Sequence, residues 1–226
     1  MAKLFLLRHL KSQWNEDNRF AGWVDNPLSK EAVLDAKIVA EKLLSENIDI
    51  VYTSALMRNM ETVARIFDNF SEKYPLFLHI DGGKMQTWGN FTDISESDVS
   101  VYVSEKLNER YYGQLQGLSK KAIEKKYGQE KAHAWRRGFL ARPPKGESLQ
   151  DVYKRAVPFF KKYAEKDLKV GKNVLIVASH NSLRAVVKYV ENISDDKISE
   201  VELPFGALVK YNFNDGEYEK LLAPFK

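Results

Sequence analysis

The chain has 226 residues, of which 44% are hydrophobic and 29% are charged, as is usual for a soluble globular protein. It contains no cysteine, which excludes a disulfide framework and a thiol nucleophile. No apolar stretch reaches transmembrane length and no secretory signal precedes the first apolar run, so we expect a cytoplasmic protein with no membrane contact. Its length and the lack of a linker predict a single domain over residues 1–226.

The net charge of +4 fits an anionic substrate, although a lysine-rich solvated surface is the simpler explanation. The basic residues are spread along the chain without an RNA-binding motif or a long basic block. We therefore expect no nucleic acid partner.

The predicted elements alternate between strands and helices. Near-continuous apolar runs predict buried strands at residues 3–7, 48–52 and 173–178. Apolar residues at helical spacing predict helices that begin at Ser29, at Met57, at Ser148 and at Ser182, with Ser29 and Ser148 as N-caps. The alternation predicts an α/β fold, a three-layer, doubly wound, mostly parallel sheet with helices on both faces.

Residues 70–106 interrupt this alternation with several glycines and two short β-like pieces, at 77–80 and 99–103. The segment has the character of an insertion, either a hairpin or a lid. Beyond it, helices are predicted near 120–127 and 131–137, and a strand at 207–213.

Two of the predicted strands lead into a histidine, His9 after the first and His180 after residues 173–178. Ligands of parallel sheets bind at the carboxyl ends of the strands, so both imidazoles are expected in one crevice. Arg8 precedes His9, and Arg58 lies in the first turn of a helix, where anions are favoured. A lone histidine at a strand end is more often structural. Together, however, an imidazole that can attack phosphorus and guanidinium groups that bind phosphate favour phosphoryl transfer through a phosphohistidine.

Six motifs extend this pattern along the chain. They are Arg8-His9-x-x-Ser12-x-Trp14-Asn15, Asn18-Arg19-Phe20-x-Gly22-Trp23, Tyr52-Thr53-Ser54-x-Leu56-x-Arg58, Leu107-Asn108-Glu109-Arg110-x-Tyr112-Gly113-x-Leu115-Gln116-Gly117, Trp135-Arg136-Arg137 and Asn181-Ser182-Leu183-Arg184-Ala185. In this order they resemble the cofactor-dependent phosphoglycerate mutases of the histidine phosphatase superfamily. The resemblance covers nearly the whole chain outside residues 70–106. The motif at 107–117 and the Trp-Arg-Arg triplet favour the mutase branch over general phosphatases.

The resemblance implies interconversion of 3-phosphoglycerate and 2-phosphoglycerate through a phosphohistidine primed by 2,3-bisphosphoglycerate, without a metal. The alternative enzyme is a broad-specificity histidine phosphatase acting on small phosphomonoesters. A degenerate member that only binds phosphorylated metabolites or a protein is the non-enzymatic alternative. The expected partner is a small phosphorylated metabolite. The family includes homo-oligomers of several kinds, and no sequence feature here selects one.

The resemblance also implies roles for individual residues. His9 is the expected nucleophile, with its other ring nitrogen held by an acceptor, and Glu109 is the expected general acid/base. Arg8, Arg58, Asn15 and His180 are expected around the phosphoryl oxygens. The other substrate-binding candidates are Ser12, Ala21, Gly22, Arg110, Tyr112, Lys120, Arg136, Arg137 and Asn181. A surface ion pair at Glu109-Arg110, a solvated face at Arg136-Arg137 and a core aromatic at Tyr112 are the structural alternatives.

The chain departs from the family pattern beside both histidines. Leu10 and Lys11 stand where the family usually has Gly and then Glu or Gln. The second motif lacks the glycine of His-Gly-Asn-Ser, so a gapless match places Ser179 at the position of the family's histidine. A shifted backbone would let His180 fill the same space, and we expect His180 to contact the phosphoryl group.

Overall fold

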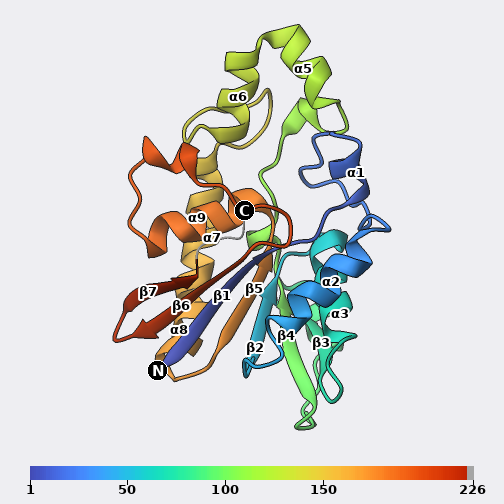
Figure 1. The fold of residues 1–226 in the computed structure, drawn as a ribbon, viewed down its shortest axis with the longest axis vertical. Coiled ribbons are helices and arrows are strands. Elements are labelled where there is room, and N and C mark those ends of the chain that lie inside the picture. Colours follow the sequence, from blue (N-terminus) through green and yellow to red (C-terminus); the bar gives the residue numbers. More distant parts are fainter. Residues whose placement is uncertain (223–226) are drawn as a thin grey trace.

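The computed structural model describes residues 1–222, and its strands there form one twisted sheet in the order β3-β4-β2-β5-β1-β6-β7 (Figure 1). The strands are β1 (Ala2–Arg8), β2 (Ile50–Thr53), β3 (Tyr74–His79), β4 (Asp98–Val103), β5 (Val174–Ala178), β6 (Leu208–Asn214) and β7 (Glu217–Leu222). Strands β1 to β5 pair in parallel, whereas β6 runs antiparallel to both β1 and β7. The predicted mostly parallel sheet is confirmed.

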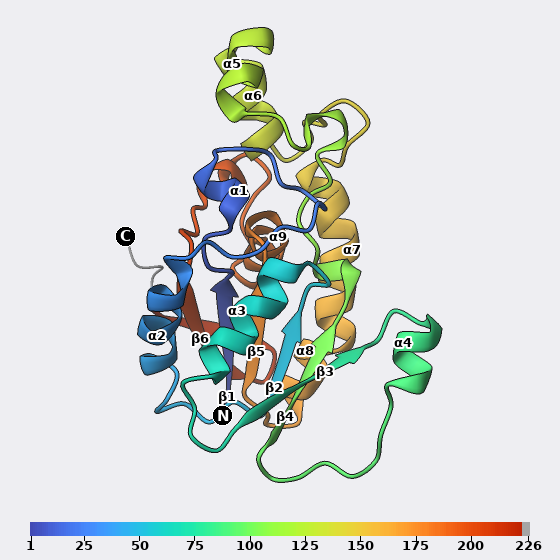
Figure 2. The ribbon, with the colours of Figure 1, turned by 90° about the vertical axis from the view of Figure 1, so that its right-hand side faces the viewer.

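Helices cover both faces of this sheet, as predicted for a three-layer fold (Figure 2). They are α1 (Gln13–Glu16), α2 (Ala32–Glu41), α3 (Met57–Phe67), α4 (Gly83–Trp88), α5 (Lys120–Tyr127), α6 (Gln129–Arg137), α7 (Leu149–Lys162), α8 (Ala164–Lys169) and α9 (His180–Val190). Residues of α2 and α3 share a buried cluster with one face of the sheet, and residues of α7, α8 and α9 share a cluster with the other. Within residues 1–222, no helix is both long and apolar enough to span a membrane.

The near-continuous apolar sequence of β1 fills both cores because successive side chains of a strand point to opposite faces. Leu4 and Leu6 pack with the α7–α9 side, while Phe5 and Leu7 pack with the α2–α3 side. All four are fully buried. A strand buried on both faces has little freedom to slip in register, which fixes where its carboxyl end lies.

The segment at residues 70–106 is neither the hairpin nor the lid that its sequence suggested. Its two ends form β3 and β4, which pair in parallel and extend the sheet at one edge. Between them α4 projects from that edge, away from α5 and α6 (Figure 2). Long-range strand pairing, which local sequence does not encode, makes the two ends of this segment part of the central sheet.

The prediction that Ser29 is the N-cap of α2 is also wrong. The helix begins at Ala32, Ser29 lies in the turn before it, and the Ser29 hydroxyl has no hydrogen-bond partner among residues 1–222. The second expected cap is confirmed at α7. The Ser148 hydroxyl accepts from the Asp151 amide at 3.2 Å, and the Ser148 amide donates to the Asp151 carboxylate at 2.8 Å.

This capping box makes a testable contribution to stability. Replacing Ser148 with Ala removes the acceptor for the Asp151 amide, so we expect the free energy of unfolding to fall by about 1 kcal/mol. Urea denaturation measures the change. Ser119→Ala is the matched control, because Ser119 is the N-cap of α5 but makes no side-chain capping bond. Equal losses in the two variants would contradict the assignment.

Candidate active site

The two strand-end histidines lie at the same edge of the sheet, because β1 and β5 are neighbouring parallel strands. Arg8 pairs with Ala178 in the register of these strands. The backbone amide of His9 donates to the Ala178 carbonyl at 3.1 Å. His180 begins helix α9 two residues after Ala178. The predicted convergence at the carboxyl ends of the strands is therefore present.

A cavity of about 200 Å³ opens at this edge. It is lined by Arg8, His9, Asn15, Arg19, Phe20, Ala21, Gly22, Arg58, Glu109, Tyr112, Lys120, Arg136, Arg137, His180, Asn181, Glu202 and Phe205. Six of these residues are arginine or lysine and two are glutamate. With neutral histidines the lining carries a formal charge of +4, which suits a ligand with several negative charges.

His9 is held in a form that suits nucleophilic attack. Its Nδ1 lies 2.6 Å from the Leu10 carbonyl oxygen, so a proton on Nδ1 is donated to that carbonyl and Nε2 keeps its lone pair. Burial, and then the charges of Arg58 and Arg8, lower the pKa of His9 well below its usual range. The imidazole is therefore neutral at pH 7.

Arg8, which is partly buried, and Arg58, which is almost completely buried, place two guanidinium groups beside His9. Arg8 donates to the Leu203 carbonyl at 2.6 Å, and Arg58 donates to the Gly22 carbonyl at 2.8 Å. The Nε of each has no partner among residues 1–222. Burial lowers the pKa of Arg8 to about 10 and also lowers that of Arg58. Both remain charged at pH 7 and have donors left for an anion.

Glu109 is buried beside these cations, and Asn181 orients its carboxylate. Oε1 of Glu109 accepts from Nδ2 of Asn181 at 2.6 Å and from the Arg110 amide at 2.6 Å. The same Nδ2 donates to the Tyr112 hydroxyl at 3.1 Å. Glu109 and Arg110 are both buried, so they do not form the surface ion pair that was the structural alternative.

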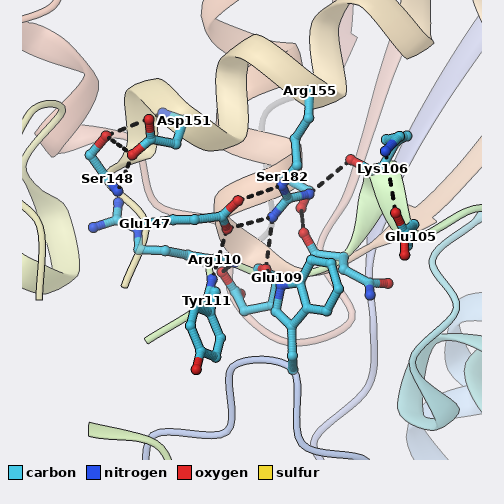
Figure 3. Close-up of polar contacts among 12 residues, drawn as sticks. Glu105, Lys106, Glu109, Arg110, Tyr111, Glu147, Ser148, Asp151, Arg155 and Ser182 are labelled. Carbon is cyan, nitrogen blue, oxygen red and sulfur yellow. Dashed lines mark hydrogen bonds and ion pairs between the residues drawn. The ribbon is translucent and has the colours of Figure 1, made fainter. Parts of the chain in front are cut away.

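The main-chain carbonyl of Glu109 is held by the side chain of Arg155, which belongs to α7 (Figure 3). Arg155 donates to the Glu109 carbonyl and to the Lys106 carbonyl, each at 2.9 Å, and pairs with the Glu147 carboxylate at 2.9 Å. The indole of Trp23 donates to the same Glu109 carbonyl at 2.6 Å. These contacts tie the main chain of Glu109 to α7 and to Trp23.

A second group of cations lines the cavity from the segment of α5 and α6. Lys120 begins α5, and Arg136 and Arg137 end α6. Burial, with the charges of Arg136 and Arg8, lowers the pKa of Lys120 to about 8. Arg137 forms an ion pair with Glu202.

His180 lines the cavity and Ser179 does not. The Ser179 hydroxyl is buried and accepts from Nδ2 of Asn59 at 3.1 Å. Nε2 of His180 lies 3.5 Å from a carboxylate oxygen of Glu202 but forms no hydrogen bond within residues 1–222. Burial lowers the pKa of His180 to about 3, so this imidazole is also neutral.

Of the predicted site residues, only Ser12 and Arg110 lie outside the lining. The Ser12 hydroxyl donates to Oδ1 of Asn15 at 2.8 Å, which orients the Asn15 amide. Arg110 is fully buried and donates to Oδ1 of Asn181 at 3.1 Å. Gly22 adopts φ +54°, and a side chain there would collide with Gln116.

Four lining residues were absent from the predicted set: Arg19, Phe20, Glu202 and Phe205. Arg19 and Phe20 belong to the motif at residues 18–23, and the sequence could therefore have identified them as candidates. Glu202 and Phe205 lie in the loop at 201–207, which has no sequence periodicity. Leu10, one of the departures from the family pattern, packs in the core with α2 and does not line the cavity.

This arrangement can bind an anionic ester between two groups of cations, accept a phosphoryl group on a neutral imidazole and move a proton through a buried carboxylate. Within the described part of the chain, no group of three or more His, Cys, Asp or Glu side chains is placed to hold a metal ion.

Comparison with known proteins agrees with this chemistry. Residues 4–81 and 85–223 match the model of the histidine phosphatase superfamily, branch 1. A 2,3-bisphosphoglycerate-dependent phosphoglycerate mutase from Methanococcus vannielii is 39% identical, over 98% of this chain and 94% of that protein. The protein of the same name from Protochlamydia amoebophila is 40% identical, over 97% and 99%.

Solved structures share the fold at low sequence identity. Bacillus stearothermophilus YhfR aligns with a TM-score of 0.76 at 20% identity, over 97% of this chain and 95% of that one. A mycobacterial glucosyl-3-phosphoglycerate phosphatase aligns with a TM-score of 0.77 at 19% identity, over 98% of each chain. The family model and the two relatives show that the chain belongs to the histidine phosphatase superfamily and, within it, to the phosphoglycerate mutase family. The resemblance inferred from the motifs is confirmed.

The lowered pKa of Lys120 makes anion binding depend on pH. Sulfate, which keeps both charges across the range, should bind more weakly as the pH rises through about 8, because the ammonium group loses its proton. We expect its Kd to rise roughly tenfold between pH 7 and 9, measured by calorimetry. Lys120→Arg keeps its charge and should remove this step. The same pH profile in both proteins would contradict the prediction.

Proposed function

We propose that the protein interconverts 3-phosphoglycerate and 2-phosphoglycerate through a phosphohistidine at His9, primed by 2,3-bisphosphoglycerate. One observation carries the proposal: two groups of cations line a single cavity, with His9 and Glu109 in the same lining. A phosphatase needs only the first group, which binds the phosphoryl oxygens. A mutase must also hold the second charged end of its ligand. The names of the relatives support the same assignment.

His9 is the proposed nucleophile. Its Nε2 attacks phosphorus while the Leu10 carbonyl keeps the proton on Nδ1. Because the ring is buried and neutral, no proton has to leave before attack. Arg8, Arg58 and His180 would surround the phosphoryl oxygens, where negative charge is spread in the transition state.

Glu109 is the proposed general acid/base. As a carboxylate it would take a proton from the incoming hydroxyl, and as the resulting carboxylic acid it would give that proton to the departing substrate oxygen. The side chain of Asn181 and the Arg110 amide donate hydrogen bonds to Oε1 of Glu109. Oε2 is more weakly hydrogen-bonded, since the donor nearest to it is the Asn181 backbone amide at 3.5 Å. We assign the proton transfer to Oε2.

Lys120, Arg136 and Arg137 fit the second end of a bisphosphate or of a carboxylated monophosphate. Burial, with the charges of Arg136 and Arg8, lowers the pKa of Lys120 to about 8, so its ammonium group lies in a part of the wall where other cations are close. The bisphosphate, when bound, supplies the phosphoryl group that charges His9. We also propose a cytoplasmic location, where phosphoglycerates are metabolised.

Labelling tests the nucleophile directly. Incubation with labelled 2,3-bisphosphoglycerate should give an acid-labile, alkali-stable protein adduct that His9→Ala abolishes. His133→Ala, which changes an exposed histidine, is the matched control and should label normally. An unlabelled intact protein would favour a binding module without turnover.

An enolase-coupled assay, with and without the bisphosphate primer, then separates the two enzymatic functions. The mutase requires isomerisation that the primer stimulates. Release of phosphate without isomerisation would support the broad-specificity phosphatase instead.

The second histidine gives a paired prediction. His180→Ala should lower turnover by roughly 10²-fold or more if the imidazole contacts the phosphoryl oxygens. Ser179→Ala should keep its turnover but lose about 1–3 kcal/mol of stability, because Nδ2 of Asn59 is left buried without its acceptor. Turnover and urea denaturation measured on both variants check this. The opposite pattern of turnover would place the phosphoryl contact on Ser179.

A further inference from the structure

A second cavity of about 200 Å³ adjoins the reaction cavity on the side of the loop at 201–207. It is lined by Asp35, Ile38, Val39, Lys42, Pro204, Phe205, Gly206 and Ala207. Most of these side chains are apolar, in contrast to the cationic lining around His9. Among the residues that the structure describes, Phe205 alone belongs to both linings.

The ring of Phe205 lies directly beside the phosphoryl-accepting groups. The guanidinium carbon of Arg8 is 3.7 Å from the centre of the ring, and the His9 ring is 5.7 Å from it. The stacked guanidinium adds a cation–π attraction to the packing. A group that extends from the phosphoryl site towards the loop therefore meets the Phe205 ring.

The loop that carries Phe205 is tied to Arg8 at several points. The Arg8 amide donates to the Ala207 carbonyl at 3.0 Å, and the Gly206 amide donates to the Arg8 carbonyl at 3.2 Å. Gly206 adopts φ +70°, and a side chain there would lie 3.3 Å from a methyl group of Leu10. The backbone that carries the Phe205 ring is therefore held in place against Arg8 and Leu10.

We propose that Phe205 is a specificity-determining residue: its ring closes the reaction cavity towards the adjoining apolar cavity and restricts the substrate to short phosphate esters. The proposal rests on the function proposed above for the chemistry at His9. A smaller side chain at this position joins the two cavities. The joined space, which gains the apolar side chains of Ile38, Val39 and Pro204 beside the charged Asp35 and Lys42, accepts esters whose alcohol part is bulky and apolar, such as aryl phosphates.

An aryl phosphate such as p-nitrophenyl phosphate probes this space with the chemistry of the same site. The Nε2–P bond forms as the aryl O–P bond breaks, and p-nitrophenolate leaves without needing a proton. Water then forms a new P–O bond as the N–P bond breaks, which regenerates neutral His9 and releases orthophosphate. Glu109 takes the proton of the attacking water and returns it to solvent.

The test is a series at one position, Phe205→Leu, Phe205→Val and Phe205→Ala. The kcat/KM for p-nitrophenyl phosphate relative to that for 3-phosphoglycerate should rise as the side chain shrinks, by about tenfold or more for alanine. Adding Ile38→Trp to Phe205→Ala refills the adjoining cavity and should reverse the rise. Ile38→Trp alone should leave the ratio unchanged, since Ile38 lines only the second cavity.

If kcat/KM fell equally for both esters, so that their ratio stayed constant, the proposal would be overturned. Phe205 would then act only as a support for Arg8. If the alanine variant does not fold, the trend from Phe through Leu to Val decides the question. The wild-type protein tests the underlying function separately. If it hydrolyses both esters but never isomerises, the mutase assignment fails, and phosphate release from the two esters still measures the size restriction.

Discussion

The site depends on guanidinium groups that are buried against neutral acceptors. Arg58, Arg110 and Arg184 are almost completely inaccessible to solvent. Their N–H groups donate hydrogen bonds to main-chain carbonyl oxygens and to the amide oxygen of Asn181. Neutral acceptors satisfy hydrogen bonds without cancelling charge, so the cavity keeps its positive potential. Burial of this charge is costly, and an entering polyanion relieves that cost and stabilises the folded protein.

The parts of this site that sequence could predict are those set by short-range patterns. Apolar runs identify β1 and β5, and the strand-end position of His9 and His180 follows from them. Helical spacing identifies α3 and places Arg58 in its first turn. Parallel pairing then brings these ends together, since the carboxyl ends of parallel strands share an edge. Glu109 lies outside regular strands and helices, and only the family motif singled it out.

Other features depend on contacts between segments that no local pattern reveals. Glu202 and Phe205 reach the cavity because the loop at 201–207 is bonded to Arg8, nearly two hundred positions earlier in the chain. The strands β3 and β4 join the sheet through pairing partners distant in sequence. Ser29 satisfies the rules for an N-cap, yet a turn precedes the helix and leaves its hydroxyl unused. Tertiary contacts override local preference at each of these places.

Asn181 links the carboxylate of Glu109 to the C-terminal end of α6. Its Oδ1 accepts from Arg110, which donates to the Trp135 carbonyl, and from Arg184, which donates to the Arg137 carbonyl. Its Nδ2 holds the carboxylate of Glu109. The end of α6 and the proton-transfer group therefore form one mechanical unit with two parallel linkages. A displacement of that helix end must either break these hydrogen bonds or carry the carboxylate with it.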